Sequence, residues 1–118
     1  MTPYHAAVEV SFDTERLAKI CNSDKALVRS YGPEGAKRIA RRLTQLSAAA
    51  CLEDLRNGPG RCHELAGDRA GRLSLDLNGP YRLIFRPGDA EKARREDGGL
   101  MWAAVTEVIV IEIVDTHG

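Results

Sequence analysis

Apolar and polar residues alternate near the start of the chain, and the period then changes to that of a helix. The alternation covers residues 4–12 and predicts a half-buried strand. Asp13 or Thr14 is expected to cap a short helix that follows. Ser23 is expected to cap a second helical stretch, which Gly32 and the proline after it would end.

The strongest helical pattern covers residues 34–49. Its apolar side chains recur at helical spacing and would face the core; they are Ala36, Ile39, Ala40, Leu43 and Leu46. The opposite face is basic, with Lys37, Arg38, Arg41 and Arg42. A basic helix face is usually only a solvated surface, but Arg38, Arg41 and Arg42 are also candidates for binding nucleic acid.

From residue 61 to the end of the chain the sequence predicts four strands, the first three from alternation of apolar and polar residues and the last from an apolar run. They are expected over residues 61–66, 71–77, 81–86 and 105–115. The last one has apolar residues at both odd and even positions, so it is expected to lie centrally in the sheet and to be covered on both faces. The charged, glycine-rich segment 87–104 is long for a connection, which indicates that it is either mobile or functional.

Residues 78–80 (Asn-Gly-Pro) predict a hairpin between the second and third of these strands. A two-residue loop would pair Leu75 with Arg82 and mix the two faces. A three-residue loop pairs Leu75 with Leu83 and places nearly all the large apolar side chains on one face, so we predict that register. The opposite face is then polar, with Arg72, Ser74, Asp76, Arg82 and Arg86.

The order of these elements predicts the fold class. A strand, then helices, then four strands with a tight hairpin indicates a single α+β domain over residues 1–118. We expect an antiparallel sheet of four to five strands with the N-terminal helices packed on one face.

Composition excludes several classes and leaves nucleic-acid binding open. The 118 residues carry 17 basic and 17 acidic side chains, so the formal net charge is zero. Basic groups are nevertheless in excess over residues 29–72, and acidic groups over 87–118. Three cysteines without a CxxC pair predict free thiols in a reducing cytoplasm, and no zinc-ligand spacing is present. No membrane span, signal peptide, metal or cofactor is expected.

A small group of residues could carry chemistry by themselves. His63 and His117 can exchange protons near neutral pH, and Arg82 and Arg86 offer planar guanidinium groups to a phosphate. Two histidines and several arginines without a metal suit cleavage of RNA by its own 2′-hydroxyl, which needs a base, an acid and a cation. Each residue also has a structural interpretation: a strand histidine, arginines that pair with Asp76, or a terminal tail.

Two segments of the chain resemble the RelE/ParE toxin superfamily, and most of all its HigB branch. Residues 61–87 (RCHELAGDRAGRLSLDLNGPYRLIFRP) contain the branch's His-x-Leu-x-Gly-Asp element and its arginine-bearing hairpin strand. Residues 108–118 (VIVIEIVDTHG) end at the position of its closing Asp-Tyr-His. The stretches CNSDKALVRSYG and EDGGLMW further resemble a longer subgroup, the plasmid-maintenance killer proteins.

The resemblance implies the toxin of a type II toxin–antitoxin pair. Such a toxin is neutralised by a HigA-like helix-turn-helix antitoxin, and it meets operator DNA only through that antitoxin. Catalytic members cut mRNA on the ribosome without a metal. Their site residues fall on His63, Arg82, Asp115 and His117, with Asp115 orienting His117 or sharing in the proton transfers. Further phosphate and RNA contacts are expected from Arg61, Arg69, Arg72, Arg86 and from the basic helix face, Arg38, Arg41 and Arg42.

Two positions depart from the pattern of catalytic relatives. Ala66 stands where they commonly have a lysine, and Thr116 stands where the closing aromatic residue is expected. Arg69 or Arg72 could replace the missing cation. The alternative is a catalytically degenerate protein that only binds an antitoxin or, as ParE-type members do, DNA gyrase. A housekeeping RNA-binding domain without a partner gene is a third hypothesis.

Overall fold

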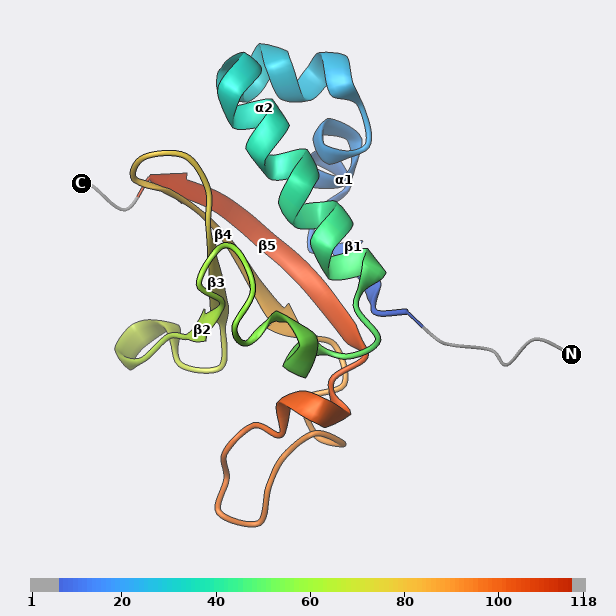
Figure 1. Cartoon of the computed structure of the whole chain (residues 1–118), viewed down its shortest axis with the longest axis vertical. Helices are drawn as coiled ribbons and strands as arrows, with labels where there is room; N and C mark the ends of the chain where they lie inside the picture. The colour runs from blue at the N-terminus through green and yellow to red at the C-terminus, as the bar shows by residue number, and fades with distance from the viewer. Residues whose placement is uncertain (1–6, 116–118) are drawn as a thin grey trace, which may run out of the picture.

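Residues 7–115, which the computed structural model describes, form a five-stranded sheet with two α-helices beside it (Figure 1). The α-helices are α1 (Glu15–Cys21) and α2 (Asp24–Ala48). The strands are β1 (Glu9–Phe12), β2 (His63–Glu64), β3 (Leu73–Asp76), β4 (Tyr81–Pro87) and β5 (Glu107–Asp115), arranged in the order β1-β5-β4-β3-β2. Three short 3-10 helices connect them: η1 (Leu52–Leu55), η2 (Gly67–Arg69) and η3 (Trp102–Ala104).

Side-chain caps start both α-helices where the sequence predicts them. The Thr14 hydroxyl accepts a hydrogen bond from Leu17 N at 3.1 Å, and the Ser23 hydroxyl accepts one from Ala26 N at 3.1 Å. Gly32 has the left-handed φ of 77°, which breaks the helical path inside α2. The predicted interruption is therefore confirmed, and α2 bends at this point (Figure 1).

The hairpin register is also the predicted one. Leu73 lies opposite Phe85 and Leu75 opposite Leu83, while Leu77 N donates to Tyr81 O at 3.0 Å across the turn. These leucines and Phe85 are buried against the apolar side chains of α2. The polar face of the sheet points away from the helices, as the alternation requires.

Two strand predictions need correction. β1 pairs with β5 in parallel, so the sheet is mixed, although β2 to β5 are antiparallel neighbours. The strand expected over 61–66 shrinks to His63–Glu64, because Arg61 (φ 46°) and Gly67 (φ 66°) have left-handed backbones that turn the chain at both ends. The first three positions of the predicted strand 4–12 lie outside the described residues.

A β-bulge explains why β5 is apolar at both parities. Phe85 pairs with Val110 and Ile84 with Glu112, so Ile111 is an extra residue in β5. Val108 and Val110 therefore face the core before the bulge, and Ile113 packs against the core after the bulge. β5 lies inside the sheet as predicted, but it is not covered on both faces, because its residues from 111 onward are only half-buried or exposed.

The long connection between β4 and β5 packs onto the sheet edge beside β2. Ala93 is fully buried, and its carbonyl accepts a hydrogen bond from Met101 N at 2.6 Å. The Trp102 indole donates to Glu64 Oε2 at 2.9 Å, and the Arg56 guanidinium lies 4.1 Å from the ring centre. These contacts cover the two-residue edge strand β2 with the connection.

A pair of glycine substitutions tests the packing between α2 and β3. Gly60 and Gly71 have nearly the same left-handed φ, 91° and 90°. A Cβ at Gly60 would lie 2.7 Å from Arg42 Nε, whereas a Cβ at Gly71 would meet nothing within 4 Å. Gly60→Ala should therefore lower the free energy of unfolding by about 1–3 kcal/mol more than Gly71→Ala in urea denaturation. Equal losses would contradict this close approach.

Candidate active site

The polar face of the sheet gathers most of the residues that the sequence singles out. Alternation along β3, β4 and β5 places Asp76, Arg82, Arg86 and Glu112 on the side away from the helices. The cross-strand pairs His63 with Ser74, Ser74 with Ile84, and Ile84 with Glu112 form one row across the four strands. Ser74 and Ile84 are buried in the middle of this row, and the charged side chains surround them.

Asp76 is the junction that orders two of the predicted arginines. Its Oδ2 accepts a hydrogen bond from Arg61 Nε at 2.7 Å, and this bond raises the pKa of the Arg61 guanidinium. Its Oδ1 lies 3.0 Å from Arg82 Nε, an ion pair without a hydrogen bond on that oxygen. Arg82 also donates through Nη1 to the carbonyls of Gly79 (3.0 Å) and Tyr81 (2.8 Å). The Arg82 guanidinium is thus held in place at the hairpin end.

The helical pattern predicted that Arg42 lies on an exposed basic face, and this prediction is wrong. The Arg42 side chain is buried, and Nε donates to the backbone carbonyl of Asp76 at 2.9 Å. Burial lowers the pKa of its guanidinium, with the charge of Arg38 acting in the same direction. Arg42 is buried because α2 approaches the end of β3 closely enough to enclose its long side chain. Lys37 and Arg41 are exposed and Arg38 is half-buried, so these three residues still place positive charge on the outer face.

Glu112 is the residue that sequence reasoning missed. Its Oε2 lies 3.8 Å from Nη1 of both Arg69 and Arg72, which reach across the polar face from the loop before β3. At 3.8 Å these are ion pairs rather than hydrogen bonds, so the guanidinium donors remain available to a second anion. The signal in the sequence is the single charge that interrupts the apolar stretch 108–114.

His63 is exposed at the border of this face, and its environment selects a tautomer. Its Nδ1 lies 2.7 Å from the carbonyl oxygen of Arg61, which can only accept a hydrogen bond. The ring must therefore carry a proton on Nδ1, and in the neutral imidazole Nε2 is the basic nitrogen. Ala66, at the position where relatives commonly have a lysine, is exposed two residues beyond β2.

The structure does not bring Asp115 together with His63. Asp115 lies opposite Tyr81, and Tyr81 is on the same face of β4 as Leu83. Asp115 therefore belongs to the helix side of the sheet rather than to the polar face. Three strand spacings of about 4.8 Å also separate β2 from β5. His117 and Thr116 lie outside the described residues, so their predicted roles stay predictions.

The arrangement offers anion binding and one exposed imidazole. On this face the arginines Arg61, Arg69, Arg72, Arg82 and Arg86 outnumber the carboxylates of Asp76 and Glu112. Burial raises the pKa of the neighbouring Cys62 thiol to about 12, which keeps it protonated and unsuited to act as a nucleophile. Among residues 7–115 no group of three or more His, Cys, Asp or Glu side chains could hold a metal ion. None of the helices in that range is long and apolar enough to cross a bilayer.

Comparisons with known proteins identify the family. The family model of HigB-like toxins, described as a RelE-like toxin of the type II toxin–antitoxin system HigB, matches residues 10–94. Among solved structures, a YoeB/ParE toxin from Agrobacterium tumefaciens superposes with a TM-score of 0.56 at 12% identity, over 90% of this chain and 95% of that one. That likeness shows a shared fold. No curated protein matches the chain. Since the family match covers well over half of the chain, this protein belongs to the HigB-like branch of the RelE-like toxins of type II toxin–antitoxin systems.

Proposed function

We propose that this toxin inhibits translation by cutting mRNA on the ribosome in the cytoplasm, without a metal. The observation that carries the proposal is the exposed His63 ring, with its basic nitrogen Nε2 at the border of an arginine-rich face. A phosphodiester that lies on this face would meet several guanidinium groups and a proton acceptor together.

In the proposed reaction, His63 takes the proton of the RNA 2′-hydroxyl. The 2′-oxygen attacks the neighbouring phosphorus, and the bond from phosphorus to the 5′-oxygen breaks to leave a 2′,3′-cyclic phosphate. Arg82, with Arg86, would stabilise the charge that develops on the phosphate oxygens. His117 would protonate the leaving 5′-oxygen. We leave Asp115 out of the proton transfers, because its parity places it on the helix side of the sheet.

Arg69 and Arg72 are the proposed substitutes for the lysine that relatives have at position 66. Both guanidinium groups converge on Glu112, and the two arginines and this carboxylate together carry a net charge of one positive unit. A phosphate that approaches Glu112 would therefore find two cations already oriented by one carboxylate. Arg38 and Arg41 would contact ribosomal RNA from the outer face of α2.

A second candidate function is favoured by Ala66. Its exposed methyl group supplies no charge where catalytic relatives commonly carry an ammonium. The protein would then keep the toxin fold and act by binding, either to an antitoxin alone or, in the ParE manner, to DNA gyrase.

Cleavage of a defined mRNA by the purified protein, with and without programmed ribosomes, separates the two functions. Primer extension should show cuts only in the presence of ribosomes. His63→Ala should reduce the rate about 10²–10⁴-fold, because it removes the proton acceptor. Arg95→Ala, in the connection between β4 and β5, is the matched control and should leave the rate unchanged.

An Ala66→Lys variant completes the experiment. If only this variant cuts, the site is correctly located but the natural chain has lost activity. If neither the parent nor this variant cuts, or if His63→Ala cuts as fast as the parent, the nuclease proposal is wrong. DNA damage in cells before any loss of translation would favour gyrase as the target.

The arginines around Glu112 give a separate prediction for RNA affinity. Arg69→Gln or Arg72→Gln should reduce the salt dependence of binding to a short single-stranded RNA by about 0.7 in log–log slope for each phosphate that the variant no longer neutralises. Glu112→Gln should tighten binding, because it removes an anion that competes with phosphate. Fluorescence anisotropy between about 50 and 200 mM salt measures both effects. The Arg95→Gln variant should behave like the parent, and identical slopes in all variants would contradict the site.

A further inference from the structure

An open depression lies at the start of β2, beside the polar face of the sheet. It has a volume of about 460 Å³ and is lined by Arg56, Asn57, Gly58, Arg61, Cys62 and His63. Arg61 and His63 belong to the polar face, through the bond of Arg61 to Asp76 and the pairing of His63 in β2. Arg56 comes instead from the turn after η1, which contributes nothing to the candidate active site.

Two neighbours hold the Arg56 side chain in one orientation. Its guanidinium carbon Cζ lies over the ring of Trp102, 4.1 Å from the ring centre. Glu53 accepts hydrogen bonds from Nε at 2.6 Å and from Nη2 at 3.3 Å. Trp102 is itself buried and is fixed by the hydrogen bond from its indole to Glu64. The guanidinium plane is therefore oriented before a ligand arrives, so binding costs little side-chain entropy.

One face of the Arg56 guanidinium stays open. Trp102 covers one face and Glu53 one edge, yet the Arg56 side chain is 47% exposed and lines the depression. A planar cation that rests on an aromatic ring offers its other face to a second planar group. In single-stranded RNA the unpaired bases are such groups, and they stack on guanidinium planes as well as on aromatic rings.

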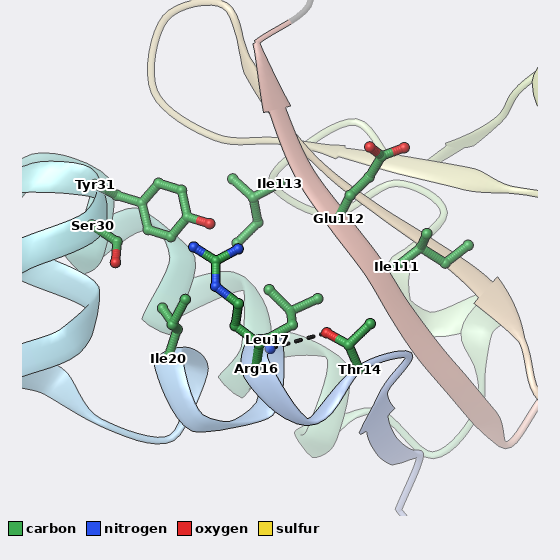
Figure 2. A pocket seen from close by; sticks show the side chains of 9 residues that line it. All are labelled: Thr14, Arg16, Leu17, Ile20, Ser30, Tyr31, Ile111, Glu112 and Ile113. Atoms are coloured by element: carbon green, nitrogen blue, oxygen red, sulfur yellow. Dashed lines mark hydrogen bonds between the residues drawn. The ribbon is translucent and has the colours of Figure 1, made fainter.

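The depression continues the surface on which the phosphate is proposed to lie. The row of paired residues described above leads from Glu112 across the sheet to His63, which also lines the depression. Figure 2 shows the side chains of Glu112 and Ile113 on opposite sides of β5, with Glu112 turned away from the helices. An RNA chain laid along this row would pass over His63 and come next to Arg56.

We propose that Arg56 is a stacking platform for one base of the RNA, next to the phosphate that lies beside His63. The base rests on the open face of the guanidinium, opposite Trp102, while Arg61 contacts the adjoining phosphate. The inference rests on the proposed function, because it takes single-stranded RNA as the ligand. It adds a contact to a base, whereas the arginines of the polar face contact phosphates. Since every base has a flat face, the contact tolerates any sequence.

Binding of the full chain to two short single-stranded RNAs tests the platform. The second RNA has the same length and the same phosphates but lacks bases at its central positions. In fluorescence anisotropy the parent should bind the first at least about fivefold more tightly, the lower end of what one base stack contributes. Arg56→Lys keeps the charge but loses the plane, so it should remove most of this difference and leave affinity for the abasic RNA within about twofold.

A matched control and a second readout separate stacking from general damage to the protein. Arg95 is also an exposed arginine beside a carboxylate, so Arg95→Lys should keep the full difference between the two RNAs. Trp102 is the single tryptophan of the chain, so fluorescence emission reports on the ring beneath Arg56. The emission should change when the parent binds the base-containing RNA and stay constant with the abasic RNA.

Equal affinity of the parent for the two RNAs, absence of RNA binding, or an Arg56→Lys variant that keeps the difference would overturn the inference. Its failure is distinct from failure of the proposed function. A parent that does not cut mRNA on the ribosome, but whose preference for base-containing RNA is lost in Arg56→Lys, would reject the nuclease proposal and leave the platform standing. A parent that cuts mRNA while Arg56→Lys binds both RNAs as the parent does would reject the platform alone.

Discussion

The residue on which the rest of the structure depends is Asp76, at the end of β3. Its amide donates to Gly60 O at 2.7 Å, its carbonyl accepts from Arg42, and its carboxylate holds Arg61 and Arg82. One residue thus joins the helix layer, the segment that leads into β2 and the hairpin strand β4. Because three guanidinium groups share this one acidic residue, the helix side and the polar side of the sheet are connected through it.

The polar face shows how a chain of zero net charge can still present a cationic surface. Three of its five arginines, Arg61, Arg69 and Arg72, come from the region 29–72 where basic residues are in excess, and two carboxylates hold four of the five in place. A carboxylate between two arginines lowers their repulsion and keeps both guanidinium groups on the same face, while its own charge competes with a further anion. The excess of acidic groups over residues 87–118 lies mainly in β5, which has Glu107, Glu112 and Asp115 and no lysine or arginine.

The bulge in β5 separates two surfaces with different chemistry. Before Ile111, β5 is covered by β1 on one edge and by the helices on one face. After it, the strand continues without β1, with the Glu112 carboxylate towards the arginines and Ile113 packed against the core on the helix side. The extra residue shifts the alternation by one position, so that apolar side chains can remain on the core side at both ends of the strand.

The sequence by itself determined the fold class, both helix caps, the bend at Gly32 and the hairpin register, because each of these depends on local periodicity or on one turn. It also indicated His63 and Arg82 through a resemblance that the family match supports. Only the tertiary structure decided that β1 is parallel to β5, that Arg42 is buried and that Asp115 lies on the helix side. It alone showed that Glu112 holds Arg69 and Arg72. These features depend on contacts between residues far apart in the chain, or on one inserted residue that reverses the face of a strand, and local patterns specify neither.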